Sequence, residues 1–103
     1  MSQDENELWQ ALQSVHDEET FRQFLLALVD DREASVAQEK VAHSSPYGPD
    51  AGGWENTTIE GFFEAAAAWA HTSRNGLPLA GYVPPWNPWR RCADILFVGK
   101  SYE

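Results

Sequence analysis

The chain has 103 residues, which is enough for one domain with a single hydrophobic core and too few for a second domain. Hydrophobic residues make up 43% of the chain, so an entirely disordered protein is excluded as well. The formal net charge of −9 disfavours binding to nucleic acid or to an anionic membrane, and it favours either simple solubility or a basic protein partner.

The negative charge is unevenly placed along the chain. Residues 1–64 contain 14 acidic and three basic residues, whereas residues 65–103 contain two acidic and four basic residues. The acidity therefore belongs to the first two thirds. If this part is an interaction surface, we expect its partner to be basic and the association to weaken as salt screens the charges.

The sequence does not show the features of a secreted or membrane protein. Cys92 is the one cysteine and cannot form an internal disulfide, and the N-terminus has neither the basic start nor the apolar run of a signal peptide. The longest apolar run falls far short of the roughly 20 residues needed to span a bilayer. We therefore expect a cytoplasmic protein.

Apolar spacing predicts helical structure in the first 43 residues. Residues 1–7 are polar and are expected to be frayed, after which one helical stripe begins, although a segment this short is also compatible with a strand. The stripe consists of Leu8, Trp9, Leu12 and Val15. The strongest periodic signal predicts a helix from about residue 18 to 31, capped by Asp17 or Ser14, with a weaker helical continuation over 30–43. Its apolar positions are Phe21, Phe24, Leu25, Leu28 and Val29.

The stretch from Trp54 to Ala70 predicts a capped, half-buried helix around which we expect the fold to be organised. Thr57 and Glu60 have the spacing of a capping box, and Asn56 is the alternative cap. Apolar residues at the helical period predict the face turned to the core, with Trp69 at its edge. They are Ile59, Phe62, Phe63, Ala66 and Ala70. A second side of small residues predicts the close approach of another helix, and it consists of Gly61, Ala65 and Ala68.

Two segments rich in glycine and proline predict long loops, at 44–53 and at 74–86. In the second loop, Gly76 ends the central helix. Asn87 then caps a final helix with Pro88 at the first position, where its missing N–H has no cost. That helix is apolar around most of its circumference, so we expect it in the middle of the fold. Its two apolar faces are formed by Trp89, Cys92, Ala93 and Leu96 and by Ile95, Val98 and Tyr102.

Three sets of residues carry a resemblance. The first is Trp54-Glu55-Asn56-Thr57-Thr58-Ile59, followed by Phe62-Phe63-Glu64-Ala65 and Trp69; the second is Trp89 with Ala93-Asp94-Ile95-Leu96 and the terminal Tyr102-Glu103; the third is Phe21-x-x-Phe24-Leu25-x-x-Leu28. Together they resemble a family of small bacterial proteins classed as a domain of unknown function, over roughly residues 15–103. The resemblance implies a bacterial source and a shared fold, and it transfers no functional residue.

Residue spacing identifies no catalytic or metal-binding constellation. Cys92 lies on an apolar helix face, where a buried thiol is inert, and no histidine is near it in the sequence. Glu60 and Glu64 lie one turn apart, but a solvated polar face explains them better than paired catalytic carboxylates. The histidines are scattered without a partner at metal-ligand spacing, and they are His16, His43 and His71. We expect no metal and no cofactor, and an enzyme is the less favoured interpretation.

Aromatic residues gather in and beside the two predicted loops. They are Tyr47, Trp54, Tyr82, Trp86 and Trp89. Such residues either cover the core of a small domain, which we favour, or build a groove for a ligand or peptide.

The sequence therefore predicts a single all-α domain over residues 1–103, with three to four helices and two long loops. The alternative is an α+β fold with short strands at 8–15 or 81–83. The favoured function is a non-enzymatic acidic protein-binding module, with an immunity-type protein that masks a basic toxin as one example. The candidate interaction surface comprises Asp30, Asp31, Glu33, Trp54, Glu55, Glu60, Glu64 and Trp86.

The alternative function is a small-ligand binder or an enzyme that uses the loop aromatics with Glu55, Glu60 or Glu64. An open groove formed by aromatic and acidic side chains would favour this alternative. A flat acidic face would favour the protein-binding module.

Overall fold

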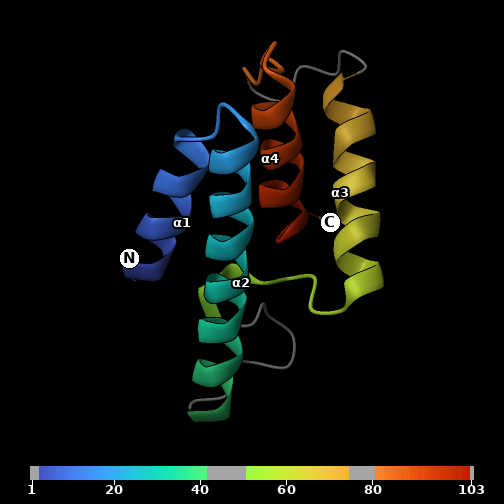
Figure 1. Ribbon diagram of the computed structural model, residues 1–103. Helices are drawn as coiled ribbons and strands as arrows, with labels where there is room; N and C mark the ends of the chain where they lie inside the picture. Colours follow the sequence, from blue (N-terminus) through green and yellow to red (C-terminus); the bar gives the residue numbers. More distant parts are fainter. Residues whose placement is uncertain (1–2, 42–50, 75–80, 103) are drawn as a thin grey trace.

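The computed structural model describes residues 3–41, 51–74 and 81–102, and these residues form four α-helices. The helices are α1 (Gln3–Gln13), α2 (Glu18–Val41), α3 (Ile59–Arg74) and α4 (Pro88–Gly99), and a short 3-10 turn covers Ala51–Gly53 (Figure 1). No strand occurs within these ranges, so the predicted all-α fold is confirmed and the α+β alternative does not hold. Several predictions fall outside the described residues, namely those on His43, Tyr47, Gly76 and the first part of the loop at 44–53.

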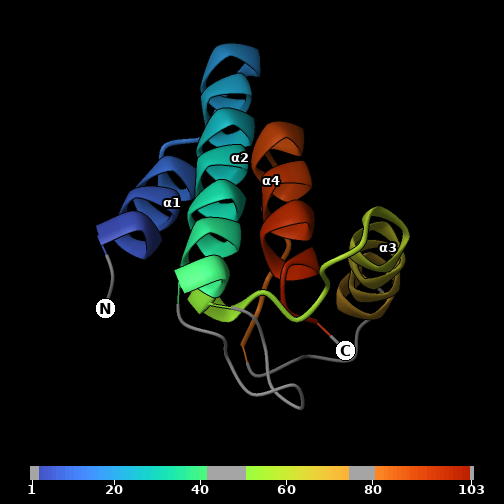
Figure 2. The same ribbon diagram turned by 90° about the horizontal axis from the view of Figure 1, so that it is seen from below.

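The helices form a curved row in the order α1, α2, α4, α3 (Figure 2). α4 packs against both α2 and α3 and also contacts α1, so α2 and α3 lie on opposite sides of it. α1 runs antiparallel to α2, and α3 runs antiparallel to α4 (Figure 1). The central place of α4 confirms what its two apolar faces predict.

α1 begins at Gln3, so residues that were expected to be frayed are already helical. Leu8 and Leu12 are buried as predicted. Trp9, by contrast, is half-exposed and packs edge-on against Phe97 of α4, with 5.8 Å between the ring centroids. The buried face of α1 is therefore narrower than the predicted apolar stripe, because it does not include Trp9.

α2 is one helix of 24 residues, so the predicted helix at 18–31 and its weaker continuation form a single element as far as Val41. A reciprocal cap fixes its start: the Thr20 N–H donates to Asp17 Oδ1 (2.9 Å), and the Asp17 N–H donates to Thr20 Oγ1 (3.0 Å). The bonds that Asp17 accepts, the one from the Thr20 amide first, lower the pKa of this carboxyl. Of the two predicted caps, Asp17 is the one used.

The core lies where α1, α2 and α4 meet. Its largest fully buried side chains are Phe24 and Leu8. Trp54 also belongs to it, so the segment before α3 contributes one side chain to the core. The buried cluster comprises Leu8, Leu12, Val15, Phe24, Leu28, Trp54 and Ala93. On α2, the predicted stripe is thus divided between Phe24 and Leu28, which are buried, and Leu25 and Val29, which are exposed.

α3 packs on α4 through part of the predicted face, which includes Ala66 and, at its edge, Trp69. Ala66, Trp69 and Ser73 are buried, whereas Ile59 and Phe63 are exposed. The apolar stripe of α3 is wider than the contact with one neighbouring helix covers, which explains the error.

The close approach of two helices occurs at Gly99 of α4. A Cβ atom added there would lie 3.0 Å from Ala66 Cβ and 3.2 Å from the Phe62 carbonyl oxygen. The predicted contact through Gly61, Ala65 and Ala68 was wrong, since Ala68 is exposed. Glycine at position 99 allows the last turn of α4 to touch the backbone of α3.

α4 begins as predicted. Asn87 Oδ1 accepts hydrogen bonds from the N–H groups of Trp89 (2.9 Å) and Arg90 (3.4 Å), and Pro88 follows the cap. The Asn87 side-chain amide donates to the His16 carbonyl (2.9 Å), which ties this cap to the turn between α1 and α2. Within the described ranges, no helix has the length and apolar character needed to cross a membrane.

Candidate functional site

An open apolar groove with a volume of ≈ 330 Å³ lies between α2 and the start of α3. The segment that connects the 3-10 turn to α3 crosses between the two helices at this level (Figure 1). The lining comprises Leu25, Leu28, Val29 and Arg32 of α2, Trp54, Asn56, Thr57 and Thr58 of the connecting segment, and Ile59, Phe62 and Phe63 of α3. The groove thus joins three parts of the chain.

Large apolar side chains are exposed on both walls of the groove. On α2, Leu25 is 37% and Val29 51% exposed; on α3, Ile59 is 76% and Phe63 57% exposed. The two residues in each helix lie one turn apart, so each pair forms a short ridge along its wall. Single exposed apolar residues are ordinary, but a contiguous set marks a binding surface in a soluble protein.

Trp54 forms the floor of the groove, and a buried ion pair holds it. Its indole N–H donates to Asp31 Oδ2 (2.9 Å), and Lys100 Nζ lies 2.9 Å from the same oxygen. Asp31 and Lys100 are both buried. These three residues, the Asp31–Trp54–Lys100 clamp, join α2, the connecting segment and the end of α4. Removal of either charge would leave the other buried without its partner.

Two cationic side chains also lie over the ring of Trp54. The Arg32 guanidinium carbon lies 5.3 Å and Lys100 Nζ 5.6 Å from the centroid of the indole ring. Phe62 packs beside it with 6.0 Å between ring centroids. Because the protein's own cations already interact with this ring, the floor offers apolar contact rather than a site for a cationic ligand.

The connecting segment satisfies the end of α4. The N–H groups of Glu55 and Asn56 donate to the Lys100 carbonyl (3.1 and 3.2 Å), and the Asn56 side-chain amide donates to the carbonyls of Gly99 and Tyr102 (2.9 Å each). The last carbonyls of a helix have no partner within it. The sequence Trp54-Glu55-Asn56 therefore supplies the C-terminal cap of α4 and, at the same time, the floor of the groove.

α3 is capped by Thr58, one residue later than predicted. The Gly61 N–H donates to Thr58 Oγ1 (3.0 Å), and the Phe62 N–H donates to the Thr58 carbonyl (3.0 Å). The predicted box of Thr57 and Glu60 was wrong because the preceding residues are bound to the end of α4, so the helix cannot begin before residue 58. Glu60 lies in the first turn, where the helix dipole favours a carboxylate.

A second polar cluster joins α3 and α4 away from the groove. Arg91 donates to the Ala70 carbonyl and to Ser73 Oγ (2.9 Å each), and its guanidinium carbon lies 5.3 Å from the centroid of the Trp69 ring. The Tyr82 hydroxyl donates to Asp94 Oδ2 (2.8 Å). Burial raises the pKa of Tyr82, and this hydrogen bond adds to the effect. In the described residues no buried side-chain nitrogen or oxygen lacks a partner, and the bonds of this cluster join α3, α4 and the segment before α4.

Residues 17–103 match the model of a family described as "Family of unknown function (DUF7660)". The chain belongs to this family. The resemblance to a family without a known activity is thereby confirmed. No curated protein and no solved structure matches the chain. The range that matches DUF7660 includes the whole groove, whereas α1 lies before it although Leu8 and Leu12 are in the core.

Within the DUF7660 range, the predicted interaction residues fall into two groups. Asp31 and Trp54 are buried in the clamp, although Trp54 also lines the groove. The exposed group comprises Asp30, Glu33, Glu55, Glu60, Glu64 and Trp86. Trp86 is 92% exposed and directly precedes the Asn87 cap of α4. α4 begins at the end of the helix row opposite the start of α3, where the groove lies (Figure 1). The predicted surface is therefore not one continuous patch.

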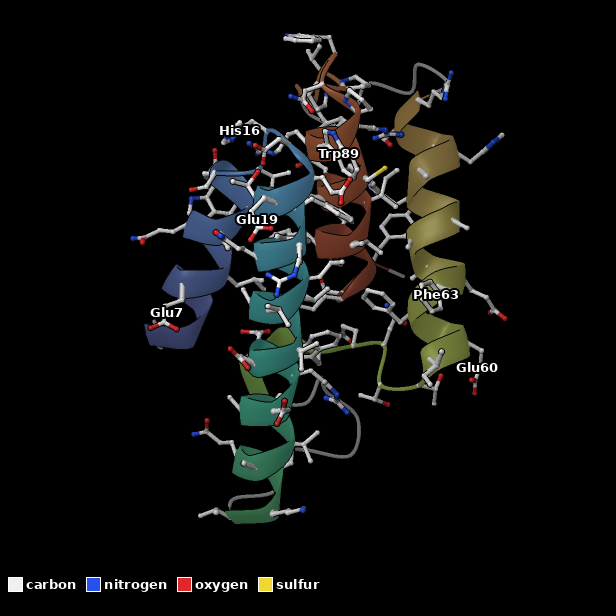
Figure 3. All side chains as sticks on the ribbon, in the orientation of Figure 1. Glu7, His16, Glu19, Glu60, Phe63 and Trp89 are labelled. Atoms are coloured by element: carbon white, nitrogen blue, oxygen red, sulfur yellow. The ribbon has the colours of Figure 1, made fainter. Side chains whose placement is uncertain are left out.

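Three of the exposed carboxylates lie close in the sequence to residues that line the groove. Glu33 follows Val29 by one turn on α2, and Glu60 and Glu64 directly follow Ile59 and Phe63 on α3. Figure 3 shows Glu60 on the side of α3 turned away from α2. These carboxylates lie next to lining residues in the sequence, or one turn from them, and are not part of the groove's lining.

The candidates for catalysis are not brought together. Cys92 is exposed, contrary to the expected burial, because the face of α4 at that position lies between its helix contacts. His16 and His71 are exposed on different elements. The described residues contain no group of three or more His, Cys, Asp and Glu that is suited to a metal ion. Trp54, one of the loop aromatics, lines the groove. The glutamates predicted to act with the aromatics, Glu55, Glu60 and Glu64, do not line it.

The helical period predicts that several of the groove residues face the core. The exposed ones among them are Leu25, Val29, Ile59 and Phe63. What distinguishes these residues is the width of the apolar face to which they belong. In both helices the apolar residues span more of the circumference than one neighbouring helix covers, and the excess marks a second, unfilled contact.

Proposed function

We propose that this protein is a non-enzymatic protein-binding module and that the groove is its site for a basic partner. The observation that supports this is the contiguous apolar groove of ≈ 330 Å³, together with the exposed carboxylates that follow its lining residues along α2 and α3. The apolar walls provide surface that a partner removes from water. The carboxylates attract a basic partner and disfavour an acidic one. An immunity-type protein that masks a basic toxin would require this combination.

A small-ligand binder is the second candidate, because small-molecule pockets have volumes of about 300–1,000 Å³. Such pockets add a few polar groups that converge on the ligand. In the groove, the side chain of Asn56 is bound to the end of α4 and the Arg32 guanidinium lies over Trp54. The groove is also open and mostly apolar, which favours a macromolecular contact over a small polar ligand.

The test is affinity capture from a lysate of the source organism. We compare the wild type with Glu60→Gln/Glu64→Gln, which neutralises two carboxylates beside the groove. Glu7→Gln/Glu18→Gln is the matched control, because it removes the same charge elsewhere and Glu18, like Glu60, lies in the first turn of a helix. Asp31 is left intact, since its substitution would break the clamp.

The expected result is a basic protein that the wild type and the control retain at low salt. High salt should release it as the Debye length falls below about 8 Å, and the groove variant should retain much less of it. A partner that ignores both salt and the Glu60/Glu64 substitutions would contradict the proposal. Retention of a small apolar molecule, with no protein partner, would favour the second candidate.

A further inference from the structure

We propose that the groove binds an amphipathic α-helix of the partner, with apolar residues along one face and lysine or arginine at the edges of that face. This inference rests on the proposed function and specifies the form of the partner. It is carried by the shape of the two walls, by the backbone chemistry of the groove and by the distribution of charge around it.

The two walls have the form that a helix requires. Leu25 and Val29 on α2 and Ile59 and Phe63 on α3 are pairs spaced by four residues, and rows with this spacing interdigitate when helices pack. Because α2 and α3 lie on opposite sides of α4, a helix placed between them would contact one ridge on each side (Figure 2). Its own anchors would recur at i, i+3 or i+4, and i+7.

The lining residues of α2 indicate how much of a bound helix the groove contacts. They run from Leu25 to Arg32. At about 1.5 Å of rise per residue, they extend roughly 10 Å. The bound helix would therefore contact this wall over about two turns.

Backbone chemistry favours a helix over an extended peptide. An extended peptide usually binds by adding to the edge of a sheet, and the described part of the chain contains no strand. In an apolar groove its N–H and C=O groups would be removed from water without partners. A helix satisfies these groups internally, so it can fill the groove at no such cost.

The charges favour a foreign basic helix over a second copy of this chain. A second copy would bring its own net charge of −9 against the same carboxylates. Glu33, Glu60 and Glu64 are exposed and lie outside the lining of the groove, whereas Arg32 is part of it. The bound face should therefore be apolar at its centre, where Arg32 disfavours a second cation, and basic at its edges.

Two synthetic peptides of identical leucine and lysine composition test the inference. In one, leucine recurs at the helical period; in the other, leucine and lysine alternate as in a strand. The expected result is that the helical-period peptide binds at low salt, gains helical circular dichroism and shifts the NMR signals of the groove methyl groups. The alternating peptide should bind at least about tenfold more weakly, the equivalent of about 1.4 kcal/mol.

Matched valine substitutions locate the binding site. Val29→Lys adds a charge inside the groove, and Val41→Lys adds the same charge at an 88% exposed position of the same helix. Val29→Lys should weaken binding of the helical-period peptide by at least about tenfold, and Val41→Lys by less than about twofold. Val29 is itself half-exposed, so both variants should fold, and circular dichroism of the free proteins checks this.

Three results would overturn the inference. The first is equal binding of the two peptides, or equal weakening of binding by the two valine substitutions. Either would show that the peptides bind through charge attraction and not in a helix-specific groove. The proposed function would then still stand. The second is that neither peptide binds at low salt. The third is self-association of the wild type that Val29→Lys abolishes, which would assign the groove to a second copy. Failure of the proposed function would instead appear in the capture experiment.

Discussion

The hydroxyl of Thr58 satisfies the Gly61 amide at the start of α3, whereas Thr57 is exposed at the groove. Thr58→Ala should therefore lower the free energy of unfolding by about 1 kcal/mol, because a donor in the first turn loses its acceptor. Thr57→Ala should change it by less than about 0.5 kcal/mol. Urea unfolding followed by circular dichroism measures both values, and equal losses would contradict the assignment of the cap.

Ionisation of Tyr82 should lower the free energy of unfolding at alkaline pH. Burial, followed by the hydrogen bond to Asp94, raises its pKa above the ordinary value of 10.0. A raised pKa means that the fold favours the neutral phenol, so the contribution to stability is complete below pH 10.0 and is lost as the pH rises through the folded pKa. The stability advantage of the wild type over Tyr82→Phe should shrink between about pH 10 and about pH 12. An advantage that stays constant across this range would show that the phenol does not titrate as argued.

Single residues are where sequence prediction is weakest, and the two threonines show why. Thr57 and Thr58 have the same chemistry and adjacent positions, so local rules cannot choose between them. The choice depends on Asn56, which is held by Gly99, 43 residues away. Cys92 is similar: the helical period places it on an apolar face, but its exposure depends on where the neighbouring helices lie.

At the scale of elements, the contact between α3 and α4 depends on one missing methyl group. Gly99→Ala would place a Cβ atom 3.0 Å from Ala66 Cβ and 3.2 Å from the Phe62 carbonyl, and this carbonyl cannot rotate away as a side chain does. We expect a loss of about 1–3 kcal/mol in the free energy of unfolding from this overpacking.

The partner variant Ala66→Gly provides a double-mutant cycle for this contact. Alone it should cost about 1 kcal/mol through helix propensity, but combined with Gly99→Ala it removes the shorter contact. The two effects should therefore sum to more than the loss in the double variant. Additive losses, measured by thermal unfolding, would show that the two helices do not meet at these residues.

The helices themselves follow from the sequence more reliably than their orientations do. Periodicity predicts α2 and α3, and the Asn87-Pro88 start predicts α4, because these signals are local. Orientation depends on how many neighbours a helix has. α3 has the same apolar stripe whether one helix or two pack against it, so its sequence could not show that Ile59 and Phe63 would remain exposed.

At the scale of the whole molecule, the acidic excess in residues 1–64 should make stability rise with salt. Most of these carboxylates are exposed, and their mutual repulsion is screened as salt increases from about 10 mM to about 150 mM. The Asp31–Lys100 pair is buried and is screened far less. The Tm measured by differential scanning calorimetry should therefore increase over this range. A Tm that falls would mean that attractive surface pairs outweigh the repulsion.

The groove is a property of the whole molecule, which explains why the sequence predicted only parts of it. The acidic residues and the importance of the Trp54 segment were predictable from charge and motif. The apolar walls were not, because they come from two helices that lie on opposite sides of a third. Asp31 was misplaced for the same reason: its burial requires Lys100 from the other end of the chain.

The connection between the floor of the groove and the end of α4 has a consequence for hydrogen exchange. The amides of Glu55 and Asn56 both donate to the Lys100 carbonyl, so neither can exchange with solvent until the last turn of α4 separates from the connecting segment. Their protection factors should therefore be similar and should report a single local opening. A helix bound over Trp54 would suppress that opening and slow the exchange of both amides. The effect would reach a residue that the bound helix does not touch, because Lys100, which accepts these bonds, is buried and is not part of the groove lining.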